Sequence, residues 1–360
     1  MKFKIPLLLS IACGVMQAQT SNAKGDLLVL SKGDHTLGIV DVKTNKVLAR
    51  MPSGNDPHEV IASTDGTKAY ISNYGGGAYN TLTVVDLVNH KTTGTIDLGA
   101  LNGPHGLVFA GGKVWFTAEG AKAIGRFDPA TQKIDWIMGT GQDRTHMLYV
   151  TPDLKQIYTS NVSSATITIL EQKAGGGPGP GGPPRANGPG GPPPGGPGPG
   201  GPGQGGPPPG PRLQWEETVI PVGKGAEGFD VSPDGKELWA ANAWDGTISV
   251  IDIPGERVKQ TLAADVVGAN RLKFTPDGKH VLVSIINGPN LTVLDTESKA
   301  VVKRIPIGHG AEGIEIEPTG GLAYVACTAD DYIALIDLKT LEVSGHLDAG
   351  KQPDGMAWVR

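Results

Sequence analysis

Short segments that alternate apolar and polar residues recur along the chain about every 40 residues, and no segment shows the period of a helix. Each segment opens on three residues of which the central one is polar. Apolar residues follow two and four positions later, as Val60 and Ala62 follow His58. A repeat of this length is typical of four-stranded propeller blades. The alternating segments are therefore the predicted first strands of such blades.

Seven of these starts occur in the chain. They are Pro57-His58-Glu59, Pro104-His105-Gly106, Thr145-His146-Met147, Ala226-Glu227-Gly228, Ala269-Asn270-Arg271, Ala311-Glu312-Gly313 and Pro353-Asp354-Gly355.

Each start leads into a turn signal and three further strand-like segments. The turn Asp234-Gly235 is one example, because glycine there tolerates the positive φ of a tight hairpin. The segments 238–242 and 247–252 then read as the second and third strands of that blade. The pattern predicts four antiparallel strands per unit.

The two ends of the chain complete each other. Residues 27–52 supply the second, third and fourth strands of a blade, whereas residues 353–360 supply only a first strand. Six whole units and one shared unit predict an all-β, seven-bladed β-propeller of four-stranded blades, closed by N- and C-terminal strands that share one blade. Closing the ring in this way leaves no open sheet edge between first and last blade.

These units resemble the YVTN family of propeller repeats. That family has a Ser-Pro-Asp-Gly turn, a Tyr-Val-Ala-Asn-like strand and a Val-Ile-Asp-like strand. Its features match Ser232-Pro233-Asp234-Gly235, Trp239-Ala240-Ala241-Asn242 and Val250-Ile251-Asp252. The resemblance covers nearly the whole predicted mature chain and implies an exported propeller. It implies little about activity, because one fold hosts many functions.

A Gly/Pro-rich insert interrupts the unit that starts at Thr145. Residues 174–212 contain almost only glycine and proline, without the strict three-residue period of collagen. We expect a disordered loop between the third and fourth strands, which acts as a spacer or contacts a cell wall or a partner. The predicted propeller thus comprises residues 24–173 and 213–360.

Residues 1–23 have the features of a signal peptide. Lys2 and Lys4 precede an apolar stretch, and small residues follow, so cleavage is expected after Ala18 or Ala23. Lipid attachment at Cys13 is an alternative. Both alternatives predict a periplasmic or extracellular protein. The mature chain would keep Cys327 alone, which rules out an intrachain disulfide and indicates a buried, inert thiol.

The net charge and the hydropathy of the chain argue against some classes of binding partner. The chain has a formal net charge of -5 and no cluster of Lys and Arg, which argues against nucleic-acid binding. No apolar run after the first twenty residues is long enough to span a bilayer. We expect a monomer whose partner is a protein, a glycan or a small ligand.

The central residues of the seven starts are the candidate site, and we call them the ring residues. Because first strands are innermost in a propeller, these side chains should surround one mouth of the channel. They are the possible metal ligands His58, His105 and His146, together with Glu227, Asn270, Glu312 and Asp354. Imidazoles facing carboxylates suit a divalent metal or an acid-base pair. The structural alternative is that the ring residues bind neighbouring backbone or turn into the blade interfaces, since they share the parity of the core residues.

A second acidic series follows the third strands and is interpreted as structural. A short acid before a turn accepts backbone N–H bonds there. The series is Asp41, Asp86, Asp128, Glu171, Asp252, Asp295 and Asp337.

The sequence thus supports two functions of different kinds. The first is a binding or interaction scaffold that takes its ligand at the polar channel mouth, with the insert on the opposite face. The alternative is a metal-dependent lyase or hydrolase with its site at the central channel, similar to the streptogramin lyases. It requires His58, His105, His146, Glu227 and Glu312 to converge within ligand distance.

Overall fold

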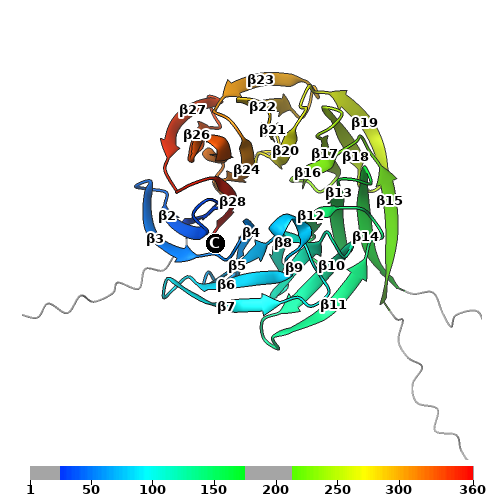
Figure 1. Cartoon of the computed structure of the whole chain (residues 1–360). Helices are drawn as coiled ribbons and strands as arrows, with labels where there is room; N and C mark the ends of the chain where they lie inside the picture. Colours follow the sequence, from blue (N-terminus) through cyan, green and yellow to red (C-terminus); the bar gives the residue numbers. More distant parts are fainter. Residues whose placement is uncertain (1–24, 175–212, 360) are drawn as a thin grey trace, which may run out of the picture.

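The computed structural model describes residues 25–174 and 213–359, which form a ring of seven four-stranded sheets around a central channel (Figure 1). All pairings within the sheets are antiparallel, which confirms the predicted seven-bladed propeller. The part of the chain that the structure describes contains no α-helix, only the short 3-10 turns η1 (Gly75–Gly77) and η2 (Thr328–Asp330). It therefore contains no helix long and apolar enough to cross a membrane.

Each blade runs from an inner strand at the channel to an outer strand at the rim (Figure 1). The first, innermost strands are β4 (Pro57–Ala62), β8 (Pro104–Ala110), β12 (Thr145–Val150), β16 (Ala226–Val231), β20 (Ala269–Phe274), β24 (Ala311–Ile316) and β28 (Pro353–Trp358). The second strands are β5 (Lys68–Asn73), β9 (Lys113–Ala118), β13 (Gln156–Asn161), β17 (Glu237–Asn242), β21 (His280–Ile285), β25 (Leu322–Cys327) and β1 (Leu27–Ser31).

The third and fourth strands complete the blades. The third strands are β6 (Thr81–Asp86), β10 (Ala123–Asp128), β14 (Thr166–Ala174), β18 (Thr247–Asp252), β22 (Asn290–Asp295), β26 (Tyr332–Asp337) and β2 (Thr36–Asp41). The fourth strands are β7 (Lys91–Asp97), β11 (Lys133–Gly139), β15 (Leu213–Pro221), β19 (Arg257–Ala263), β23 (Val301–Pro306), β27 (Glu342–Leu347) and β3 (Lys46–Pro52).

The two ends of the chain share one blade, as the sequence predicts. β28 pairs with β1 in the order β28-β1-β2-β3, and Leu27 lies opposite Trp358 in this pairing. The last strand of the chain thereby supplies the first strand of the blade that the N-terminal segment begins. Backbone hydrogen bonds join the ends and close the ring.

The hydrophobic core is divided among the interfaces between neighbouring blades. One cluster packs Trp239 and Val250 of one blade against Leu272 and Val283 of the next. Because both faces of every sheet pack against a neighbour in a closed ring, the inner strands are apolar on both sides of the pleat. The second strands show this, since they are almost wholly buried.

A buried asparagine ends the second strand in three blades. The Asn242 side-chain amide donates to the hydroxyls of Thr247 and Ser249 on the third strand, at 2.9 and 3.0 Å. Asn73 and Asn161 make the same pair of bonds in their own blades. Each amide bonds two hydroxyls of the third strand and fixes the turn that leads out to the channel mouth.

The innermost strands bulge at the ring residues. Between Pro57 and Val60 the first strand holds one residue more than its partner, and all seven blades share this irregularity. A bulge of this kind re-aims side chains and breaks the alternation of the strand. The ring residues therefore no longer alternate in step with the core residues that follow them. As a result, ring residues of neighbouring blades, such as His105 and His146, meet at the mouth.

Buried hydroxyls link the bulge of one blade to the next blade. Thr117 accepts a hydrogen bond from the Gly106 N–H at 2.9 Å and donates one to the His146 carbonyl at 2.6 Å. Ser160 and Ser284 form the same bridges, to the carbonyls of Glu227 and Glu312 respectively. We call these three contacts the hydroxyl bridges. Each one holds two neighbouring innermost strands at a fixed spacing.

Where the hydroxyl is missing, glycine lets the strands touch directly. A Cβ atom on Gly313 would lie 2.2 Å from the carbonyl oxygen of Asp354 in the next blade, and one on Gly355 would lie 2.2 Å from that of His58. A Cβ atom on Gly228 would likewise overlap the carbonyl oxygen of Asn270. No side chain fits in these positions without moving backbone, which explains the glycine at these starts.

The structure also tests the predictions for the turn acids, the cysteine and the insert. Turn carboxylates accept backbone N–H bonds after five of the third strands, which confirms their structural role at Asp41, Asp86, Asp128, Asp295 and Asp337. Glu171 instead contacts the side chains of Gln156 and Lys173, and Asp252 that of Arg257. Cys327 is a buried free cysteine, and burial raises the pKa of its thiol to about 12, as expected of an inert residue. β14 and β15 pair as far as Ala174 and Leu213. Ala174, the first residue of the predicted disordered insert, therefore lies in a strand, and the rest of that insert, residues 175–212, lies outside the described residues.

The contact at Gly313 leads to a stability prediction. Gly313→Ala should lower the free energy of unfolding by about 1–3 kcal/mol, because the new methyl group overlaps the Asp354 carbonyl. Gly345→Ala is the matched control in the same sheet, since a Cβ there has no atom within 4 Å and should change stability by at most about 0.5 kcal/mol. Denaturant unfolding of both variants measures the difference. Equal stability of the two would contradict the strand contact.

Candidate functional site

The channel mouth is built from two sets of side chains. The first comprises the ring residues at the starts of the innermost strands. The second comprises the residues that directly follow the second strand in three consecutive blades, namely Lys32, Tyr74 and Glu119. Because second strands end where first strands begin, both sets reach the same end of the channel. Their contacts with one another, described below, place them in one site.

His105, His146 and Glu119 form a buried cluster on one side of the mouth. Their exposed fractions are 3%, 2% and 6%, and their ligand atoms lie within 4.8 Å of one another. Nδ1 of His146 makes a very short hydrogen-bond contact with Glu119 Oε1. The His105 ring lies against the His146 ring with centroids 3.9 Å apart. We call these three residues the His-Glu cluster.

Three neighbours orient the His-Glu cluster. The Tyr74 hydroxyl donates a hydrogen bond of 2.5 Å to Glu119 Oε2. Arg144 lies 3.5 Å from that same oxygen and 3.9 Å from Glu227. Glu227 Oε1 is 3.0 Å from His146 Nε2, although the angle is too poor for a regular hydrogen bond. Both nitrogens of His146 thus face carboxylates.

The charges set the protonation of the two imidazoles in opposite directions. Burial alone would lower the pKa of His146, but the Glu227 and Glu119 carboxylates outweigh it and raise that pKa to about 9. The same imidazole helps to lower the pKa of Glu227 to about 2, against the effect of burial. Burial and the neighbouring His146 hold the pKa of His105 well below its usual range. His105 is therefore neutral, and its buried Nδ1 has no hydrogen-bond partner among the described residues.

His58 lies at the edge of the mouth and outside the His-Glu cluster. Its Nδ1 is 3.4 Å from Asp56 Oδ1, and its ring packs against those of Tyr74 and His105 with centroids 4.8 and 5.1 Å apart. Burial lowers the pKa of His58. Of the three predicted imidazole ligands, the structure thus groups His105 and His146 with a carboxylate and leaves His58 beside them.

Glu312 and Asp354 meet on the opposite side of the mouth around Lys32. Its ammonium group lies 3.0 Å from both Glu312 Oε2 and Asp354 Oδ2. Burial and the Asp354 charge raise the pKa of Glu312 to about 7, whereas the nearby cations hold that of Asp354 below its usual range despite burial. Asn270 accepts a hydrogen bond of 3.0 Å from Arg271. Glu312 therefore does not join the His-Glu cluster.

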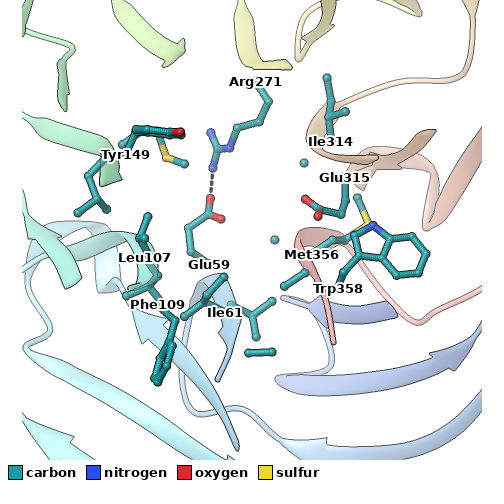
Figure 2. A pocket seen from close by; sticks show the side chains of 18 of the residues that line it. Glu59, Ile61, Leu107, Phe109, Tyr149, Arg271, Ile314, Glu315, Met356 and Trp358 are labelled. Carbon is teal, nitrogen blue, oxygen red and sulfur yellow. Dashed lines mark hydrogen bonds and ion pairs between the residues drawn. The ribbon is translucent and has the colours of Figure 1, made fainter. Parts of the chain in front are cut away.

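An axial cavity of about 400 Å³ lies in the channel beneath the ring residues (Figure 2). Its walls come from the inner strands of several blades, with Ile61, Phe109, Tyr149 and Met356 among the apolar lining. The ring residues themselves do not line it. The third residue of five of the seven starts does so instead, which places the cavity directly behind the polar mouth. These residues are Glu59, Met147, Arg271, Gly313 and Gly355.

An ion pair across the channel separates the mouth from the axial cavity. The Arg271 guanidinium reaches from β20 to Glu59 on β4, and the two side chains meet in the channel in Figure 2. Lys273 and Glu315 line the same cavity further along their strands. The lining therefore carries two cationic and two anionic groups, and their formal charges balance.

The sequence analysis did not identify several of these residues. Glu119, Tyr74 and Lys32 were missed because the search followed only the first strands, although a polar residue directly after a second strand was a visible signal. Arg144 precedes the start Thr145 and could have been found in the same way. The pairing of Arg271 with Glu59 joins residues 212 positions apart, and no local pattern indicates it.

Comparison with known proteins confirms the fold. Neither a family model nor a curated protein sequence matches the chain, so the YVTN-type repeat stays a prediction. A solved protein of unknown function from Desulfotomaculum acetoxidans is similar, with TM-score 0.69 and 11% identity over 92% of this chain and 98% of that one. A candidate 6-phosphogluconolactonase from Bacteroides uniformis has TM-score 0.66 and 15% identity over the same shares, 92% and 98%. Dihydro-heme d1 dehydrogenase NirN has TM-score 0.61 and 17% identity over 94% and 66%. At such identities the likeness shows the fold alone.

The raised pKa of Glu312 predicts a pH-dependent stability. An acid whose pKa rises on folding, here from 4.5 to about 7, stabilises the fold fully below the lower value and loses this effect as the pH rises through the upper one. The stability of the wild type relative to Glu312→Gln should therefore fall by on the order of 2 kcal/mol between about pH 5 and about pH 8. Denaturant unfolding at both pH values measures it. The exposed Glu342→Gln is the control, and an unchanged difference for Glu312→Gln would contradict the assignment.

Proposed function

We propose that the protein is a binding propeller that takes a small amphiphilic molecule in the axial cavity. The observation that carries this proposal is the cavity itself, with about 400 Å³ of space between apolar walls and a few ionisable groups. Small-molecule sites in proteins have this composition and this order of volume, from about 300 to 1,000 Å³.

The chemistry of the lining supports a ligand without net charge. Arg271 and Lys273 are matched by Glu59 and Glu315, so a neutral or zwitterionic group disturbs the balance least.

The burial of the mouth favours a small ligand over a macromolecule. His105, His146 and Asp354 are almost fully buried, and the charged groups around them are paired with one another. A protein or a glycan that docked at the mouth would meet few free polar groups there. A small molecule in the axial cavity instead contacts side chains that face an open space.

If the ligand binds in the axial cavity, a larger side chain that fills the cavity should weaken ligand binding. Ile61→Trp places a larger side chain into the lined space, whereas Ile137→Trp adds the same indole at an exposed position on β11. The probe is N-phenyl-1-naphthylamine, a neutral amphiphile whose fluorescence rises in apolar surroundings. We expect saturable binding to the wild type and to Ile137→Trp, and at least about tenfold weaker binding to Ile61→Trp. Absence of saturable binding, or equal affinity of all three proteins, would overturn the proposal.

We also propose that the protein acts outside the cytoplasm. The support is the signal-like composition of residues 1–23, which lie outside the described residues. Expression of the full chain in a Gram-negative bacterium should yield a periplasmic product that begins at Gln19 or Lys24, or at a lipid-modified Cys13. Fractionation and intact-mass measurement check this. A cytoplasmic product that retains residues 1–23 would contradict export.

A further inference from the structure

We propose that the His-Glu cluster is a binding site for a divalent transition metal ion of the zinc class. His105, His146 and Glu119 offer two imidazoles and one carboxylate, all buried and with ligand atoms within 4.8 Å of one another. This site lies on the mouth side of the Arg271–Glu59 ion pair, so the inference goes beyond the ligand proposed for the axial cavity and does not depend on it.

The fold brings the three ligands together through one hydroxyl bridge. Thr117 joins β8 and β12 by bonding the Gly106 N–H and the His146 carbonyl. Gly106 directly follows the ligand His105, and His146 is itself a ligand. Glu119 lies two residues after Thr117 on the same stretch of chain. The bridge therefore fixes the backbone of all three ligands relative to one another.

The donor atoms that a metal ion requires face the same space. Nδ1 of His105 is buried and has no hydrogen-bond partner among the described residues, an arrangement that ordinarily costs stability. Metal coordination would use its lone pair. Nδ1 of His146 and Oε1 of Glu119 share a hydrogen bond in the metal-free protein. They would complete a set of three ligands once the ion displaces the shared proton and the two atoms move apart.

The remaining atoms of these ligands are held by neighbours, as in protein metal sites. Glu227 lies beside Nε2 of His146, on the far side of the ring from Glu119. Tyr74 donates its hydroxyl to Oε2 of Glu119. Partners of this kind orient the ligating imidazole and carboxylate and raise metal affinity. With His146 neutral, as metal ligation requires, Glu119, Glu227 and Arg144 sum to one negative charge, which favours a cation.

The ligand types select the class of metal. Two nitrogens and one oxygen suit zinc and its neighbours, whereas magnesium and calcium prefer oxygen ligands alone. Ligand atoms around tetrahedral zinc are roughly 3.4 Å apart. The widest spacing of 4.8 Å therefore requires a side chain to move inward on binding. Three protein ligands also leave one position for water or another small ligand.

The test is titration of the untagged, chelator-treated protein with zinc chloride, followed by calorimetry. We expect one equivalent to bind to the wild type, and binding at least about 100-fold weaker in His105→Gln and in Glu119→Gln. His58→Gln is the matched control, because His58 is a ring residue in the adjacent blade that stays outside the His-Glu cluster. Its affinity should stay within about threefold of the wild type.

A second measurement on the wild type keeps the proposal testable if a variant does not fold. Cobalt(II) should replace zinc and give the intense visible absorption of a four-coordinate site, which zinc then displaces. Absence of saturable zinc binding in the wild type, or an equal loss in His58→Gln and His105→Gln, would overturn the proposal. Either result leaves the test of the axial cavity unaffected, since that test uses neither metal nor these residues.

Discussion

The close contact between neighbouring innermost strands is the constraint on which the rest of this structure depends. Seven sheets can close only if their first strands approach one another around the channel, where little room remains for side chains. The chain meets this requirement in two ways. Thr117, Ser160 and Ser284 bridge neighbouring blades through their hydroxyls, whereas Gly313 and Gly355 remove the side chain altogether.

These contacts also determine the chemistry of the mouth. The strand bulges that carry them release the ring residues from the core pattern, so that polar side chains become buried next to one another. Charged side chains that are buried close together must pair with opposite charges. His146 therefore lies between two carboxylates, and Lys32 bridges Glu312 and Asp354. The axial cavity lies behind the ring residues, and the Arg271–Glu59 ion pair forms part of its lining.

The fold was predictable from the sequence because local patterns that recur in every repeat determine it. Turn glycines, alternating strands and the matching ends predict seven blades, and the structure confirms them. The site was predictable only in part. Its ring residues follow the repeat, but the grouping of Glu119 with His105 and His146 depends on a bulge and on contacts between blades. Such contacts follow from the geometry of the closed ring, which no single repeat contains.

Crystal structures of Thr117→Val and Thr117→Ser test the central role of the strand contacts most directly. Valine keeps the shape of threonine without the hydroxyl, whereas serine keeps the hydroxyl. The account predicts that Thr117→Ser retains the 2.6 Å bond to the His146 carbonyl and the 3.9 Å spacing of the two imidazole rings. In Thr117→Val, β8 and β12 should separate and the His105 and His146 rings should move apart. A valine variant whose site superimposes on the wild type would contradict the account.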